Sequence, residues 1–198
     1  MDSSSSPSDP GLLTISAKIV VAGGFGVGKT TLVNSVSEVR PLNTDAWMTE
    51  ASEGVDELPP GGGKSKTTVA MDFGRITLQS DLLLYLFGTP GQARFWFLWD
   101  DLSRGALGAV VLVDTNRIDQ SFAAVNYFEN DSVLPFVVAV NRFEGKPEHD
   151  LAEVREALAL NEDVPLIECD ARSRASAIDV LQEVVTHSLS LAKVSAPG

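Results

Sequence analysis

Short apolar runs rich in Val, Ile and Leu alternate along the chain with longer segments whose apolar residues recur at helical spacing. The runs are typical of buried strands, and the periodic segments are typical of amphipathic helices. Strands are expected at residues 13–22, 67–78, 82–87, 109–113, 136–140 and 164–167, and helices at residues 30–39, 92–102, 118–129, 149–160 and 175–192.

The order of these elements predicts a three-layer α/β fold, in which helices cover both faces of a mostly parallel, six-stranded sheet. Residues 67–78 and 82–87 are separated by Gln79-Ser80-Asp81, which predicts a hairpin and hence one antiparallel edge strand. In such sheets the ligand lies beyond the carboxyl ends of the strands. The loops expected to converge there are residues 23–31, 88–91, 114–117, 141–145 and 170–172.

The length of 198 residues fits a single domain, expected at residues 12–194. Residues 1–11 are rich in Ser and Pro, which predicts a disordered tail. Residues 40–66 contain three prolines, a run of three glycines and few periodic apolar positions, which predicts an extended mobile loop.

The chain is acidic, with a formal net charge of −12, and this disfavours nucleic acid and anionic membranes as partners. A single cysteine, Cys169, excludes an intramolecular disulfide and fits the reducing cytoplasm, which is the expected location. No apolar run reaches the length of a membrane span, and no signal-peptide or lipidation pattern is visible. We therefore expect no direct membrane anchor.

Residues 23–31 read GGFGVGKTT and follow an apolar run that predicts a strand. The spacing of Gly23, Gly28, Lys29 and Thr30 is the complete phosphate-loop pattern. Glycines let backbone N–H groups wrap a phosphate, the lysine reaches the β- and γ-phosphates, and the threonine hydroxyl ligates Mg²⁺. The expected phosphate-binding residues are Gly23, Gly26, Val27, Gly28, Lys29, Thr30 and Thr31.

Four further motifs follow the phosphate loop in order: Thr-Val-Ala-Met-Asp-Phe from Thr68, Gly-Thr-Pro-Gly-Gln from Gly88, Asn-Arg-Phe-Glu from Asn141 and Asp-Ala-Arg from Asp170. With them the chain resembles small Ras-like GTPases over nearly its whole length. More narrowly, it resembles the bacterial MglA-like and conservon-type GTPases, which work with Roadblock-fold proteins. The resemblance implies a phosphate-loop G domain that binds GTP or GDP with Mg²⁺.

The first switch is implied to begin at Thr68, whose hydroxyl would contact Mg²⁺ and the γ-phosphate when the triphosphate is bound. Thr67 is an adjacent alternative. In the second switch, Gly91 would offer its N–H to the γ-phosphate and Gln92 would orient the attacking water.

One departure from the family affects the metal, because Gly88 stands where the family has the Asp that supports Mg²⁺. Asp72 could reach toward the metal in principle, although a structural role is the simpler expectation.

The family's guanine-binding motif is Asn-Lys-x-Asp, and here Arg142 and Glu144 replace its Lys and Asp. The Glu144 carboxylate would accept the guanine N1–H and N2–H₂ with both oxygens, and the stem of Arg142 could cover the base. Residues 170–172 resemble the Ser-Ala-Lys stretch whose Ala N–H meets guanine O6. The implied base-binding residues are Asn141, Arg142, Glu144, Asp170, Ala171 and Arg172.

Four aromatic residues crowd the helix expected after the second switch, and one helical face cannot bury them all. We expect Phe95, Trp96 and Trp99 at a partner interface, with burial in the core as the alternative. Arg94 could supply an arginine finger in cis, although a solvated helix position is the simpler reading.

The leading hypothesis is a slowly GTP-hydrolysing molecular switch in bacterial signalling, with Lys29 and Gln92 as its catalytic residues. A Roadblock-fold protein would serve as its activator or effector. The alternative is a hydrolysis-deficient nucleotide-binding scaffold, which Gly88 and Glu144 favour. A phosphate-loop kinase is a third, less supported reading, since no Arg-rich lid segment is found. Asp114 is expected only to cap the following helix.

Overall fold

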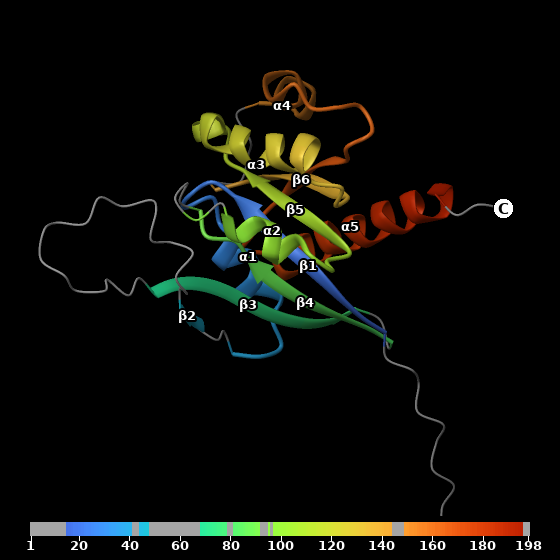
Figure 1. The fold of residues 1–198 in the computed structure, drawn as a ribbon. Coiled ribbons are helices and arrows are strands. Elements are labelled where there is room, and N and C mark those ends of the chain that lie inside the picture. Colours follow the sequence, from blue (N-terminus) through green and yellow to red (C-terminus); the bar gives the residue numbers. More distant parts are fainter. Residues whose placement is uncertain are drawn as a thin grey trace, which may run out of the picture.

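The computed structural model of the chain describes residues 15–40, 44–47, 68–78, 81–91, 95, 97–143 and 149–195 (Figure 1). The expected tail at residues 1–11 and most of the expected loop at residues 40–66 lie outside this part of the chain. So do the site candidates Gln92, Arg94, Trp96 and Glu144. No helix in the described part is long and apolar enough to cross a membrane.

The described strands form one sheet of seven strands in the order β2-β3-β4-β1-β5-β6-β7. The strands are β1 (Ile15–Gly23), β2 (Thr44–Trp47), β3 (Thr68–Leu78), β4 (Leu82–Gly88), β5 (Gly108–Val113), β6 (Phe136–Asn141) and β7 (Leu166–Cys169). Strands β4, β1, β5, β6 and β7 pair in parallel, whereas β3 runs antiparallel to both β4 and β2.

The predicted fold class is confirmed, and each of the six predicted strands is present. Strand β2 is an addition, because it lies within residues 40–66, all of which were predicted as loop. Its four residues pair with β3 and so cover the edge of the predicted sheet.

Helices cover both faces of the sheet (Figure 1). They are α1 (Lys29–Val36), α2 (Phe97–Ser103), α3 (Phe122–Asn126), α4 (Leu151–Leu158) and α5 (Arg174–Ser195), with the 3₁₀ segment η3 (Thr115–Ser121) and the π turn η4 (Tyr127–Asp131). Strand β1 shows how the layers arise. Ile19 and Val21 pack with α1 and α5, whereas Val20 and Ala22 pack with α2, α3 and α4. Successive side chains of a strand point to opposite faces, so this central strand feeds both cores.

The prediction of a single helix at residues 118–129 is wrong, because η3, α3 and η4 share this segment. Arg117 leaves the helical region inside η3, with φ −140° and ψ 47°. The π turn brings Tyr127 and Phe128 against Trp99, with ring centroids 5.2 and 6.2 Å from that of the indole. The apolar pattern that predicted one helix therefore describes burial correctly, but not the backbone.

The prediction of an exposed interface at Phe95 and Trp99 is wrong, because their exposed fractions are 8% and 2%. The alternative of burial in the core holds for both. Phe97, which was not chosen, is the exposed aromatic residue of α2.

Candidate functional site

The phosphate loop joins β1 to α1 at the carboxyl edge of the sheet, as predicted. Gly23 and Gly28 have φ values of 133° and 105°, which side chains disfavour. At Gly28 a Cβ would also lie 2.5 Å from the Asn141 amide nitrogen. The glycines in this motif therefore serve both the loop's conformation and the close approach of a neighbouring strand end.

Lys29 is buried, and its ammonium lies inside the loop. Its Nζ donates hydrogen bonds to the carbonyl oxygens of Gly23 at 2.9 Å and Gly24 at 2.7 Å. Burial lowers the pKa of Lys29 to about 8, and the nearby Asp72 carboxylate opposes this shift. The ammonium therefore carries its charge in poorly solvated surroundings, where an anionic ligand would interact with it strongly.

Thr30 and Asp72 form the second element of the site. The Thr30 hydroxyl donates to Asp72 Oδ2 at 2.7 Å, although 42 residues separate the two positions. The β3–β4 register pairs Asp72 with Gly88, and a Cβ on Gly88 would lie 2.9 Å from the same Oδ2. The Asp72 carboxylate thus occupies the space of the side chain that Gly88 lacks. This contact places Asp72 beside the threonine that the sequence predicts as a metal ligand.

The turn after β4 lies directly on the phosphate loop. A Cβ on Gly91 would come within 2.8 Å of Lys29 Nζ and 2.9 Å of the Phe25 Cα. The Thr89 N–H donates to the carbonyl of Val21 at 2.8 Å, which ties this turn to β1. Gly91 is therefore placed beside the lysine, at a distance that only a glycine allows.

Asn141 connects three segments of the site. Its amide nitrogen donates to the Val27 carbonyl at 2.8 Å, and its Oδ1 accepts the Ala171 N–H at 3.0 Å. The side chain is 6% exposed, so both bonds are shielded from water. Asn141 thus joins the end of β6 to the phosphate loop and to the loop before α5.

Of the other base-binding candidates, Arg142, Asp170 and Arg172 form ion pairs at the same edge of the sheet. Arg142 pairs with Glu168 of β7, and Arg172 donates to Asp170 from Nε at 2.9 Å and from Nη2 at 3.1 Å. The hydrogen bonds from Arg172 hold the pKa of Asp170 below its usual range. Arg142, Asp170 and Arg172 therefore each have an ionic partner, and they lie beside the buried Ala171.

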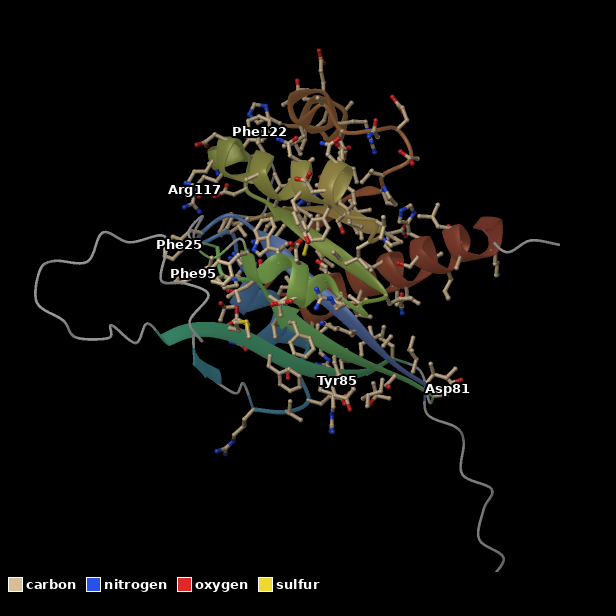
Figure 2. All side chains as sticks on the ribbon, in the orientation of Figure 1. Phe25, Asp81, Tyr85, Phe95, Arg117 and Phe122 are labelled. Carbon is tan, nitrogen blue, oxygen red and sulfur yellow. The ribbon has the colours of Figure 1, made fainter. Side chains whose placement is uncertain are left out.

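Asp114 has the expected capping role, since its Oδ1 accepts the Asn116 N–H at 3.0 Å. It also holds Arg117, which donates from Nε and Nη2 to Oδ2 at 2.9 Å each. Arg117 was not predicted as a site residue. Figure 2 shows its side chain beside Phe25 of the phosphate loop. The signal available in the sequence was an Asp and an Arg three positions apart in a loop predicted to converge on the site.

The five predicted loops therefore meet. Gly91, Arg117 and Asn141 each approach the phosphate loop, and Ala171 is joined to it through Asn141. Thr68 begins β3, and Thr30 and Thr31 are exposed at the start of α1. No group of three or more His, Cys, Asp or Glu residues that could hold a metal ion occurs in the described part of the chain.

The family model described as "Conserved hypothetical ATP binding protein" matches residues 21–191. The chain is 28% identical to an uncharacterized protein of Methanocaldococcus jannaschii, over 63% of this chain and 69% of that protein. It is 25% identical to the Ras-related protein RABC2a of Arabidopsis thaliana, over 86% and 76% of the two chains. It is 28% identical to the Ras-related protein SEC4 of Saccharomyces cerevisiae, over 79% and 67%.

Solved structures agree on the fold. The G domain of the T. maritima FeoB iron transporter superposes with a TM-score of 0.59 at 18% identity, covering 88% of this chain and 99% of that domain. The cytosolic domain of the same transporter, in a GDP form, gives a TM-score of 0.62 at 16% identity, and this chain spans 64% of its length. The fold is therefore that of the Ras-like G domain.

Proposed function

The chain belongs to the family described as conserved hypothetical ATP binding proteins, and we propose that it is a guanine-nucleotide-dependent switch that hydrolyses GTP to GDP and phosphate. The observation that carries the proposal is the convergence of Lys29 and Thr30, at the end of a complete phosphate loop, with Asp72 of strand β3. A nucleoside triphosphate with Mg²⁺ requires a cation for its phosphates and oxygen ligands, such as a hydroxyl and a carboxylate, for the metal.

The residues present fit a magnesium ion. Mg²⁺ prefers oxygen ligands, keeps several waters and is usually held by one or two carboxylates together with substrate phosphates. Thr30 and Asp72 supply a hydroxyl and a carboxylate oxygen 2.7 Å apart, beside the lysine. Bound there, the ion would neutralise charge on the phosphates. Asp72 therefore supports the proposed metal site despite the Gly88 in the second switch.

Guanine is the proposed base, although the family description names ATP. The sequence resembles the guanine-binding motif at residues 141–144, and Glu144 has the carboxylate that can accept two guanine N–H groups. Asn141 and Ala171 lie beside the phosphate loop, where the sequence predicts the base, but the Ala171 N–H predicted to meet guanine O6 donates to Asn141 Oδ1 in this structure. Adenine has no N1–H to donate, so it gains nothing from that carboxylate.

For hydrolysis, we propose that Lys29 stabilises charge on the γ-phosphate and that Gln92 orients the water. Thr68 of the first switch would contact Mg²⁺ and the γ-phosphate when the triphosphate is bound. Turnover is expected to be slow until a partner completes the site. By the resemblance of the sequence, the proposed partner is a Roadblock-fold protein, and the proposed setting is signalling in the bacterial cytoplasm.

The first experiment is equilibrium binding of GDP, GTP, ADP and ATP with and without Mg²⁺, together with phosphate release from GTP. Guanine-selective, Mg²⁺-dependent binding with slow phosphate release is the expected result. A Glu144→Gln variant should lose the selectivity, and a Gln92→Leu variant should bind GTP but release less phosphate. Equal binding of adenine nucleotides would contradict the assignment of the base. Binding with no phosphate release, alone or with Roadblock-fold proteins, would favour the scaffold.

A further inference from the structure

Arg117 contacts the phosphate loop, although it belongs to none of the motifs identified in the sequence. Its backbone departs from the helical region within η3, and its guanidinium grips the Asp114 carboxylate with Nε and Nη2. The Asp114 side chain is 8% exposed and stands where β5 ends. A buried carboxylate with two bonds to one guanidinium fixes that group's position and orientation.

The free edge of this guanidinium faces the phosphate loop. Nη1 lies 3.4 Å from the carbonyl oxygen of Phe25, and Nη2 lies 3.4 Å from that of Gly26. The same segment also touches the loop at Gly24, where a Cβ would meet that of Gln120 at 2.9 Å. Figure 2 shows the labelled side chains of Arg117 and Phe25 near one another. The η3 segment therefore lies against the loop along three consecutive residues.

Arg117 completes a set of donors to the loop's carbonyl groups. Lys29 binds those of Gly23 and Gly24, and Asn141 binds that of Val27. The Leu32 N–H binds the carbonyl of Gly28. The two remaining carbonyls, those of Phe25 and Gly26, each accept a hydrogen bond from one nitrogen of Arg117. Every carbonyl of residues 23–28 thus has a donor among the described residues.

Because of the geometry of the peptide bond, these contacts also set the direction of the loop's N–H groups. A trans peptide group is planar, so its N–H points opposite to its C=O. Holding the carbonyls of Phe25 and Gly26 against η3 directs the N–H groups of Gly26 and Val27 away from η3. In a phosphate loop these amides bind the ligand.

We propose that Arg117 is a positioning residue, which orients the Gly26 and Val27 amides toward the phosphates of the bound nucleotide. The inference rests on the proposed nucleotide binding, but not on the choice of base or on hydrolysis. It also explains why Asp114 is buried at a strand end, because the carboxylate fixes the guanidinium that holds the loop.

The long contacts indicate what the variant should do. Hydrogen bonds at 3.4 Å are weak individually, so their loss should disturb the order of a glycine-rich loop more than global stability. We expect Arg117→Ala to weaken GDP and GTP binding about tenfold, because the freed loop must be ordered again when a phosphate binds. Arg117→Lys should weaken GDP and GTP binding nearly as much, because an ammonium cannot bind Asp114 and two carbonyls in one plane.

The matched control is Arg104→Ala. Arg104 also pairs with an aspartate three positions earlier, Asp101, but it is 80% exposed and outside the loop network. Its removal should leave nucleotide binding within twofold of the wild type.

The test measures dissociation constants for GDP, GTP and inorganic pyrophosphate, together with amide hydrogen exchange of residues 26–28 in the protein saturated with pyrophosphate. The expected result is an equal loss for all three ligands and about tenfold faster exchange at Gly26 and Val27 in Arg117→Ala. Binding and exchange matching those of Arg104→Ala would overturn the proposal. A loss for GDP but not for pyrophosphate would also overturn it, because Arg117 would then act on the nucleoside.

Two further outcomes keep the proposals separate. If the wild type binds no guanine nucleotide, the proposed function fails, while pyrophosphate binding and amide exchange still decide the role of Arg117. If Arg117→Ala does not fold, Arg117→Lys retains the stem and the charge, and its exchange at Gly26 and Val27 decides. Slower or unchanged exchange in that variant would contradict the positioning role.

Discussion

The Thr30 hydroxyl donates a 2.7 Å hydrogen bond to Asp72, the residue that the β3–β4 register places opposite Gly88. The carboxylate that serves this threonine therefore comes from the strand next to the one where the family's motif has it. The two strands belong to one hairpin, so a side chain on either can occupy the same space.

Asp72→Asn should weaken Mg²⁺-dependent nucleotide binding about 10- to 100-fold, because an amide supports a cation poorly. Asp81→Asn, in the turn of the same hairpin, is the control and should bind as the wild type does. The measurement is GDP affinity across a Mg²⁺ titration. The double variant Asp72→Gly with Gly88→Asp should recover part of the loss. An Asp72→Asn protein with the wild-type Mg²⁺ dependence would remove Asp72 from the site.

Nucleotide affinity should fall as the pH rises above about 8, the pKa to which burial brings Lys29. The phosphates attract the charged form of the lysine, and the free protein loses that charge as the pH passes the pKa. Affinity for GDP should then drop about tenfold per pH unit until the pKa of the bound state is reached. Titrations at several pH values check this, and a Lys29→Arg variant should show no such fall. A flat profile up to about pH 9 would contradict the lowered pKa.

Asn141→Ala should destabilise the fold by about 2 kcal/mol, because it leaves the Val27 carbonyl and the Ala171 N–H without their buried partner. Asn126→Ala, at an exposed position of α3, tests the same change without these contacts. Chemical denaturation of the nucleotide-free proteins measures both. If the two variants unfold at the same denaturant concentration, Asn141 does not hold the three segments together.

Cys169 should resist alkylation in the folded protein. Its side chain is 1% exposed, and burial raises the pKa of the thiol to about 11, so almost no thiolate forms at neutral pH. Iodoacetamide should label it only after denaturation, as mass spectrometry of the intact protein would show. Rapid labelling of the native protein would mean that β7 opens readily.

The local parts of the site were predictable because they depend on short-range chemistry. The spacing of Gly23, Gly28 and Lys29 specifies a loop conformation by itself, and the apolar runs before Gly23 and Asn141 place both residues at strand ends. Since parallel strands share their carboxyl edge, the convergence of the loops followed from the order of the elements.

The roles of Asp72 and Arg117 could not be read in this way. Asp72 reaches Thr30 only because of the register of the hairpin, which a pattern of apolar residues does not state to the single residue. Arg117 precedes the helix predicted at residues 118–129, and its contact with the phosphate loop depends on a backbone departure inside η3 that the apolar pattern does not indicate. Phe95 and Trp99 were misplaced because aromatic content alone does not tell a core from an interface.

The bonds of Asn141 also have a consequence for how the protein is made. Its partners lie 114 residues before it and 30 residues after it. A ribosome releases the chain from the N-terminus, so the phosphate loop emerges long before the residues that hold it in shape. Closing so long a segment is entropically costly until the intervening strands have assembled. The nascent chain should therefore acquire affinity for nucleotide late, as β7 and α5 dock, so that ligand capture reports a completed fold.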